Sequence, residues 1–305
     1  MTEPISRERA LYLGVDGGGT GCRARIEDAS GVVYGTGLAG PASTRFGIEQ
    51  SWAAIEKSFM AAITEANLSS EKMARIRGGI GVAGLSRPDA LEAFSEVRHP
   101  FLSLAFASDV VIACLGAHSG RDGGVVIVGT GSSGLARMGE RYFRIGGYGF
   151  PVSDEGSGAD LGLKAVRLAL RAYDERHEWS VLLRELMDRF DNDPTKIVAW
   201  MDRATATEYA TFAPLVLRHA DQGDSIGRRI VQEAAESIDG LVRALLAAGA
   251  PRVALIGGLA SAIEPWLAPD VRRRLNTAEG DAVAGAILLA RASGPRTIPD
   301  RMKSG

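Results

Sequence analysis

The sequence predicts an α/β protein with two domains that flank a cleft. Two observations support this prediction. A buried apolar strand at residues 11–16 runs into a glycine-rich turn at 17–20, and a second strand at 125–128 runs into another such turn at 129–134. The repetition of one unit indicates a duplicated fold, in which each half brings a glycine turn to the cleft. The length of 305 residues suffices for two domains of ordinary size.

A cluster of glycines near residues 120–124 indicates that the boundary between the two domains lies there. We expect an N-terminal domain of residues 1–118 and a C-terminal domain of residues 119–305. The last helix either stays with the C-terminal domain or packs back on the N-terminal one.

Composition narrows the class of protein. Apolar residues at 46% and charged residues at 24% are typical of a soluble globular chain. The net charge of −2 provides no overall basic field, so we expect neither nucleic acid nor membrane as a partner. The chain shows no bilayer-spanning apolar run and no secretory signal, so we expect a cytoplasmic protein with Cys22 and Cys114 reduced.

Alternating apolar residues follow the first glycine turn. Cys22, Ala24 and Ile26 alternate with polar or small residues, which predicts a second strand and an antiparallel meander. Further elements of this half are a strand over 32–36, a helix over 48–68, a strand over 76–85 and a strand or strand exit over 104–111.

The second half becomes mainly helical after its opening strands. Strands are predicted over 125–128, 135–137, 142–145 and 253–256. Apolar residues at helical spacing predict helices over 157–171, 181–189, 195–202, 208–220, 224–248 and 281–292.

The first glycine turn suits a phosphate. Gly18 and Gly19 let backbone N–H groups approach phosphate oxygens, and Thr20 adds a hydroxyl donor. Asp16, at the strand end, is suited to hold a hydrated Mg²⁺. An ordinary glycine hairpin is the alternative. The P-loop is excluded because no lysine follows, and the dinucleotide fingerprint is excluded because a strand follows.

The second glycine turn could hold the same triphosphate from the other side of the cleft. Its candidate ligands are the residues Gly129, Thr130, Gly131 and Ser132, with a plain structural turn as the alternative. A third pair, Gly257 and Gly258, follows a buried strand and would allow close approach of a nucleoside, or would form a tight strand-to-helix turn.

Acidic residues near the ends of apolar runs are candidates for catalysis and for sugar binding. Asp109 suits a general base for a substrate hydroxyl, with a helix N-cap or a surface acid before residues 110–115 as the alternative. Asp154 and Glu155 could accept hydrogen bonds from sugar hydroxyls, or could simply cap the helix that follows. Tyr148 could stack on a ring.

The order of motifs resembles that of a known family. The segments GVDGGGT, ASDVVIACLGA, IVGTGSSG, GGYGFPVSDEGSG, ALIGGLA and GDAVAGAILLA resemble the phosphate, connecting and adenosine elements of the actin-like ATPase superfamily. More narrowly, the chain resembles the N-acetylglucosamine and glucosamine kinases of the BadF/BadG/BcrA/BcrD-type ATPase group. The resemblance implies two ribonuclease H-like domains, ATP and Mg²⁺ as cofactors, and a homodimer.

The resemblance also assigns roles to residues. It implies a kinase that transfers the γ-phosphoryl group to the 6-hydroxyl of an amino sugar, with Asp109 as the base and Asp154 as a sugar ligand. Ser43, Thr44 and Ser133 stand where related kinases read the sugar, often with asparagine, so N-acetylglucosamine and glucosamine both stay open.

Three rival functions are weighed against the kinase. An ATPase activator of a 2-hydroxyacyl-CoA dehydratase or benzoyl-CoA reductase would need cysteines that bind an iron–sulfur cluster, and Cys22 and Cys114 lie outside the expected segment. A non-catalytic sugar sensor would carry a DNA-binding helix-turn-helix. A filament-forming relative would lack a sugar-binding acid such as Asp154.

Overall fold

The computed structural model describes residues 10–85 and 88–292, which form two compact units. Unit 1 comprises residues 10–123, Arg137–Phe143 and 277–292, and unit 2 comprises Gly124–Ala136 and Arg144–Asn276. The boundary proposed between residues 118 and 119 stays a prediction, because these units group segments by packing and not by chain order.

Unit 1 is built on a five-stranded sheet in the order β3-β2-β1-β4-β5. β1 is antiparallel to β2, and β2 to β3, so the predicted meander is confirmed. β4 and β5 continue the sheet on the other side of β1 and run parallel to it. The strands are β1 (Leu11–Gly17), β2 (Cys22–Asp28), β3 (Val33–Ala39), β4 (Arg77–Val82) and β5 (Ser103–Ser108).

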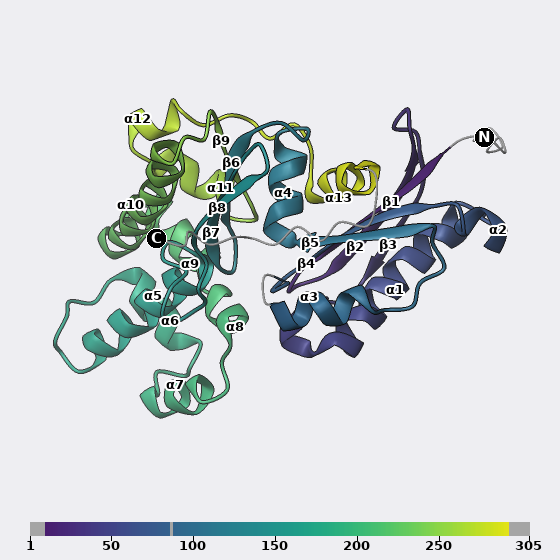
Figure 1. Ribbon diagram of the computed structural model, residues 1–305. Helices are drawn as coiled ribbons and strands as arrows, with labels where there is room; N and C mark the ends of the chain where they lie inside the picture. Colours follow the sequence, from purple (N-terminus) through teal and green to yellow (C-terminus); the bar gives the residue numbers. More distant parts are fainter. Residues whose placement is uncertain (1–9, 86–87, 293–305) are drawn as a thin grey trace. The chain divides into compact units, whose positions relative to one another are not determined.

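Helices cover both faces of this sheet (Figure 1). α1 packs on β1, β2 and β3, while α13 packs on β1 and β4 and also contacts α4. The core between the sheet and α1 contains fully buried side chains such as Leu13, Ile26, Ile55 and Phe59. The helices are α1 (Ile48–Glu65), α2 (Ser70–Met73), α3 (Pro88–Ser95), α4 (Asp109–Ala117), α13 (Ala282–Arg291) and the 3-10 helix η1 (Thr44–Phe46).

Glycines let α13 pack closely against the sheet and against α4. A Cβ atom built at Gly79 would overlap the carbonyl oxygen of Ala286, and one built at Gly285 would overlap that of Ile112 in α4. Any larger residue at either position would have to displace a backbone. The contacts between these elements therefore require glycine at both positions.

Both cysteines lie in unit 1, and each is buried and free. Burial raises the pKa of the Cys22 thiol to about 11, and the hydrogen bond to Ser58 only partly offsets this. The thiol is therefore protonated near neutral pH. The prediction of unpaired cysteines is confirmed.

The second sheet has the order β8-β7-β6-β9, with β6 parallel to β9. Its strands are β6 (Gly123–Val128), β7 (Ser132–Met138), β8 (Arg141–Gly146) and β9 (Val253–Ile256). The helices of unit 2 are α5 (Gly158–Tyr173), α6 (Val181–Asp188), α7 (Pro194–Met201), α8 (Ala206–Ala210), α9 (Ala213–Asp221), α10 (Ser225–Ala247), α11 (Ala260–Ile263) and α12 (Pro269–Arg272), with the 3-10 helix η2 (Glu264–Trp266).

Side chains set the starts of the two longest helices of unit 2. The Ser157 hydroxyl accepts from the Asp160 N–H at 3.3 Å before α5. The Asp224 carboxylate accepts from the N–H groups of Ile226 and Gly227 before α10, each at 2.9 Å. These bonds satisfy donors that a helix start leaves without a partner. In the part of the chain that the structure describes, no helix is both long and apolar enough to cross a bilayer.

The prediction of one continuous helix over 208–220 is wrong. The chain breaks between α8 and α9, and Pro214 stands in the first turn of α9. Proline has no N–H, and in a continuous helix its ring would collide with the carbonyl of Ala210. The helical spacing of apolar residues persists across the break and hides it.

Substituting Gly285 by alanine should destabilise the protein by about 1–3 kcal/mol or more, because the new methyl group must separate α13 from α4. Gly240 on α10 provides the matched control, since no atom lies within 4 Å of a Cβ built there. Gly240→Ala should be neutral or stabilising by about 0.4–1 kcal/mol. Urea unfolding followed by circular dichroism measures both. Equal stability of Gly285→Ala and the parent would contradict the close packing of α13.

Candidate functional site

The carboxyl ends of β1, β4 and β5 lie side by side on one edge of the unit 1 sheet. The parallel register pairs Gly17 with Val82, and Val82 with Ser108. Asp16 stands at the end of β1 and Asp109 directly follows β5, so that their backbones are two strand spacings apart, about 10 Å. Ligand sites of open α/β sheets occur at such edges.

The first glycine turn follows β1 at this edge. The Gly18 N–H donates to the Gly21 carbonyl, and the Gly18 carbonyl accepts from the Ala42 N–H, both at 2.9 Å. Gly19 and Thr20 are exposed, and their N–H groups donate to no protein acceptor within residues 10–85 and 88–292. A turn held at its base with free N–H groups at its tip suits a phosphate oxygen.

Asp16 is held by a cation that the sequence reasoning missed. The Arg23 guanidinium donates to Asp16 Oδ2 at 2.7 Å, and this bond raises the pKa of Arg23. The two residues are cross-strand partners of the β1–β2 hairpin. Pairing the residues of the two predicted strands across the turn would have placed Arg23 opposite Asp16. Its side chain is 54% exposed and that of Asp16 is 16% exposed, so solvent reaches the pair.

A metal ion at Asp16 would be held by few protein ligands. Among the described residues, no three His, Cys, Asp or Glu side chains come together as a metal site. Mg²⁺ commonly takes one or two carboxylates and completes its shell with water and phosphate oxygens. The single carboxylate beside free N–H groups fits that pattern.

Asp109 is both the residue that follows a strand and the first residue of a helix. β5 ends at Ser108, which is the N-cap of α4, and Asp109 is the first residue of the helix, so the alternative that Asp109 is the N-cap is wrong. The other residues of α4 are all buried, and Asp109 is half-buried. It is therefore the residue of α4 that can meet a ligand at the sheet edge.

Ser43 and Thr44 lie beside the first turn but are buried. The Thr44 N–H donates to the Ala83 carbonyl at 3.0 Å, and the Ala83 N–H donates to the Gly17 carbonyl at 2.8 Å. The Ser43 hydroxyl accepts from the Arg45 N–H at 3.4 Å. These bonds anchor the loop at the edge, and the sugar-binding role of both residues stays a prediction.

In unit 2, the second glycine turn is tied down through its carbonyl groups. The carbonyls of Val128, Gly129 and Thr130 accept from the N–H groups of Leu259 at 3.0 Å, Gly158 at 2.8 Å and Ala159 at 3.2 Å. The N–H groups of Thr130 and Gly131 donate to no protein acceptor among the described residues. The turn thus directs its acceptors into the protein and leaves its donors available.

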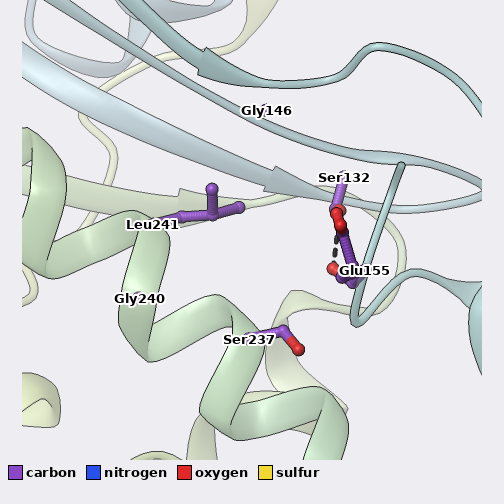
Figure 2. A pocket seen from close by; sticks show the side chains of 6 residues that line it. All are labelled: Ser132, Gly146, Glu155, Ser237, Gly240 and Leu241. Atoms are coloured by element: carbon purple, nitrogen blue, oxygen red, sulfur yellow. Dashed lines mark hydrogen bonds between the residues drawn. The ribbon is translucent and has the colours of Figure 1, made fainter. Parts of the chain in front are cut away.

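The segment before α5 lies against this turn. A Cβ atom built at Gly131 would lie 2.7 Å from Asp154 Oδ2, and Asp154 is buried with a left-handed backbone at φ 69°. The Ser132 hydroxyl donates to the Glu155 carbonyl at 2.7 Å (Figure 2). Asp154 is therefore placed beside the second turn, whereas the Glu155 side chain is exposed.

Gly257 and Gly258 join the same group. Gly257 has φ 106°, and a Cβ atom there would overlap the Val128 carbonyl oxygen. Gly258 has open space around it. The nucleoside-side turn predicted from the sequence is thus a neighbour of the second glycine turn.

A cavity of about 300 Å³ opens in unit 2 next to Ser132 (Figure 2). Ser132, Gly146 and Glu155 line one side, and Ser237, Gly240 and Leu241 of α10 line the other. Of the remaining predicted residues, Tyr148 is 68% exposed, and Ser133 is half-buried close to Gly147. Neither residue lines this cavity.

Residues 13–290 match the model of the BadF/BadG/BcrA/BcrD ATPase family. The chain belongs to this family. The match extends from β1 to α13 and so includes every residue proposed for the site. The family predicted from the order of the motifs is confirmed.

Relatives with names and structures agree with this assignment. The chain is 35% identical to glucosamine kinase GspK of Vibrio cholerae serotype O1 over 279 residues, which are 92% of this chain and 95% of the relative. A solved protein of Chromobacterium violaceum, provisionally assigned as an N-acetylglucosamine kinase, is 37% identical with a TM-score of 0.86, covering 92% of this chain and 99% of that one.

A more distant structure shows the fold alone. A ROK family glucokinase of Streptomyces griseus, solved with glucose and AMPPNP, has a TM-score of 0.54 at 17% identity, covering 93% of this chain and all of that one. The mixed α/β architecture with two sheets is that of actin-like ATPases and ROK-type sugar kinases, as the sequence predicted.

Substituting Gly131 by alanine should displace the Asp154 carboxylate and lower the free energy of unfolding by about 1 kcal/mol, because a side-chain end and not a backbone must shift. Gly129→Ala is the control, because no atom lies within 4 Å of a Cβ built at Gly129. That variant should stay within about 0.5 kcal/mol of the parent. Chemical unfolding of the three proteins measures the difference, and equal losses in both variants would contradict the contact with Asp154.

Proposed function

We propose that this chain is an ATP-dependent kinase that transfers the γ-phosphoryl group to the 6-hydroxyl of an amino sugar, either glucosamine or N-acetylglucosamine. One observation carries the proposal: Asp16 with its phosphate-type turn, and Asp109, stand at the same edge of a parallel sheet. The 35% identity to a glucosamine kinase over nearly the whole chain supports the choice of sugar.

Unit 1 would supply the base. Asp109 opens a buried helix at the sheet edge and would accept the proton of the attacking sugar hydroxyl. A carboxylate base typically contributes about 10²–10⁴-fold to the rate. Ser43 and Thr44, in the loop that ends at the same edge, would help to shape the space for the sugar.

The first glycine turn would bind phosphate. The free N–H groups of Gly19 and Thr20 would donate to phosphate oxygens, and Gly18 would hold the turn in shape. Asp16 would hold Mg²⁺, which when bound neutralises phosphate charge during transfer. Arg23 keeps the Asp16 carboxylate oriented until then.

Unit 2 would supply the second phosphate turn and sugar contacts. Thr130 and Gly131 would donate their N–H groups, while Gly129 and Ser132 fix the turn through bonds to α5 and Glu155. We assign Asp154 to the sugar, with Glu155, Tyr148 and Ser133 as further contacts. Gly257 and Gly258 would lie beside the nucleoside.

The burial of the cysteines favours a kinase over an ATPase activator. Cys22 and Cys114 are both buried in unit 1, where neither could bind a cluster shared between two chains. A homodimer in the cytoplasm, acting on a small sugar without nucleic acid or membrane, completes the proposal.

A coupled assay of ADP release tests the proposal. Purified protein with ATP and Mg²⁺ is offered glucosamine, N-acetylglucosamine, glucose, N-acetylmannosamine and N-acetylmuramic acid. We expect the highest kcat/KM with one of the first two sugars, and EDTA should abolish turnover. ADP release that is independent of any sugar would contradict the proposal.

Asp109→Asn should lower kcat by about 10²–10⁴-fold with little change in ATP affinity, because the base is lost and the phosphate turns remain. Glu49→Gln is the control, since Glu49 is another acid in the first turn of a unit 1 helix. It should keep near-normal turnover. Activity of Asp109→Asn close to that of the parent would exclude Asp109 as the base.

A further inference from the structure

A groove of about 430 Å³ lies between α5 and α10 of unit 2, outside the proposed kinase site. Three cationic side chains of α5 line it, Lys164, Arg167 and Arg171, and α10 adds Arg229. Glu233 is the single acid in the lining. The groove is thus strongly basic in a chain with a net charge of −2.

The charges of the groove are only partly compensated. The Lys164 ammonium lies 3.2 Å from Asp160 Oδ2 and 3.3 Å from Glu233 Oε2, so these acids neutralise it. Arg167, Arg171 and Arg229 form no ion pair with a carboxylate among the described residues.

Some exposed arginines of unit 2 are paired with acids. Arg176 pairs with Asp174 at 2.6 Å, and Arg243 pairs with Asp270 at 2.6 Å. Arg167 and Arg171 instead lie one helical turn apart, where like charges repel and destabilise a helix. Among the described residues, none of the three arginines Arg167, Arg171 and Arg229 has a carboxylate within ion-pair distance, and the Asp174 charge acts on Arg171 from farther away.

A histidine orients one of these cations. His177 Nδ1 lies 2.8 Å from the Glu178 carbonyl oxygen, and Arg229 donates to His177 Nε2 at 3.2 Å. This hydrogen bond orients the Arg229 guanidinium at the groove, and the partner that orients it is not a carboxylate that would compensate its charge.

The groove also has apolar lining. Leu168 of α5 and the buried Ile230 of α10 also line it. A volume of this size accommodates a small organic ligand. Guanidinium groups bind phosphate oxygens in a two-pronged geometry, and the apolar residues can contact a carbon skeleton.

We propose that this groove is a second anion site, which binds the phosphate group of a small organic phosphate through Arg167, Arg171 and Arg229. Arg167 stands nine residues beyond Gly158, the residue at the helix start that bonds to the second glycine turn. That distance is about 14 Å along α5. The groove is therefore separate from the phosphate turn of unit 2.

An NMR titration of the labelled full chain tests the proposal. The probes are inorganic pyrophosphate and glucose 6-phosphate, each compared with sodium chloride at equal ionic strength. We expect saturable amide shifts at Arg167, Leu168, Arg171 and Arg229 with either phosphate but not with chloride. Stronger binding of pyrophosphate would identify a polyphosphate ligand, and stronger binding of glucose 6-phosphate would identify a phosphate monoester.

Charge-removing variants make the test specific. Arg167→Gln/Arg171→Gln should weaken phosphate binding at the groove by about tenfold or more, since two charge-assisted contacts are lost. The control Lys196→Gln/Arg243→Gln removes equal charge from two acid-paired cations, Lys196 beside Asp191 at 2.5 Å and Arg243 beside Asp270 at 2.6 Å. It should change the affinity by no more than about twofold. Arg229→Gln is a second groove variant, for use if the first does not fold.

Several outcomes would overturn the proposal. Shifts confined to Gly129–Ser132, or equal weakening in the groove and control variants, would mean that the groove holds no specific phosphate site. Binding of a single-stranded oligonucleotide or of anionic vesicles at α5 and α10, without saturable shifts from either small phosphate, would replace it with a macromolecular surface.

Discussion

The parallel register of β1, β4 and β5 is the constraint on which the chemistry of unit 1 depends. It places the ends of three strands in one row, so that the glycine turn after β1 and the helix start after β5 share an edge. Helices approach this sheet closely at glycine positions such as Gly79. A larger residue there would move α13 away from the strands, and the loops at the edge would lose their support.

In unit 2, hydrogen bonds hold the second glycine turn in its position. Three successive carbonyls, from Val128 to Thr130, are bound by N–H groups from β9's turn and from the start of α5. Because the acceptors are already satisfied inside the protein, the turn can present donors outward without an unpaired carbonyl beside a bound anion. In both units, hydrogen bonds from neighbouring segments hold the phosphate-type turn in place.

The features that could be predicted from the sequence are those that leave a pattern in a short segment of the chain. The strands, the glycine turns and most helices are visible because alternation and helical spacing are properties of short segments. Arg23 was missed because its partner Asp16 lies across a hairpin, and the break before Pro214 was masked by continuous apolar spacing. The basic groove could not be predicted, since the cations of α5 and α10 look like ordinary solvent-facing charges until the two helices pack together.

The position of α13 bears on how the chain is made. This helix, encoded near the end of the described chain, fills the face of a sheet whose first strand is encoded near the beginning. On the ribosome, β1 to β5 emerge long before their covering helix, and the apolar surface under it stays open to solvent while unit 2 is synthesised. Completion of unit 1 therefore waits until unit 2 has been synthesised, and until then its half-covered sheet is a natural target for chaperones.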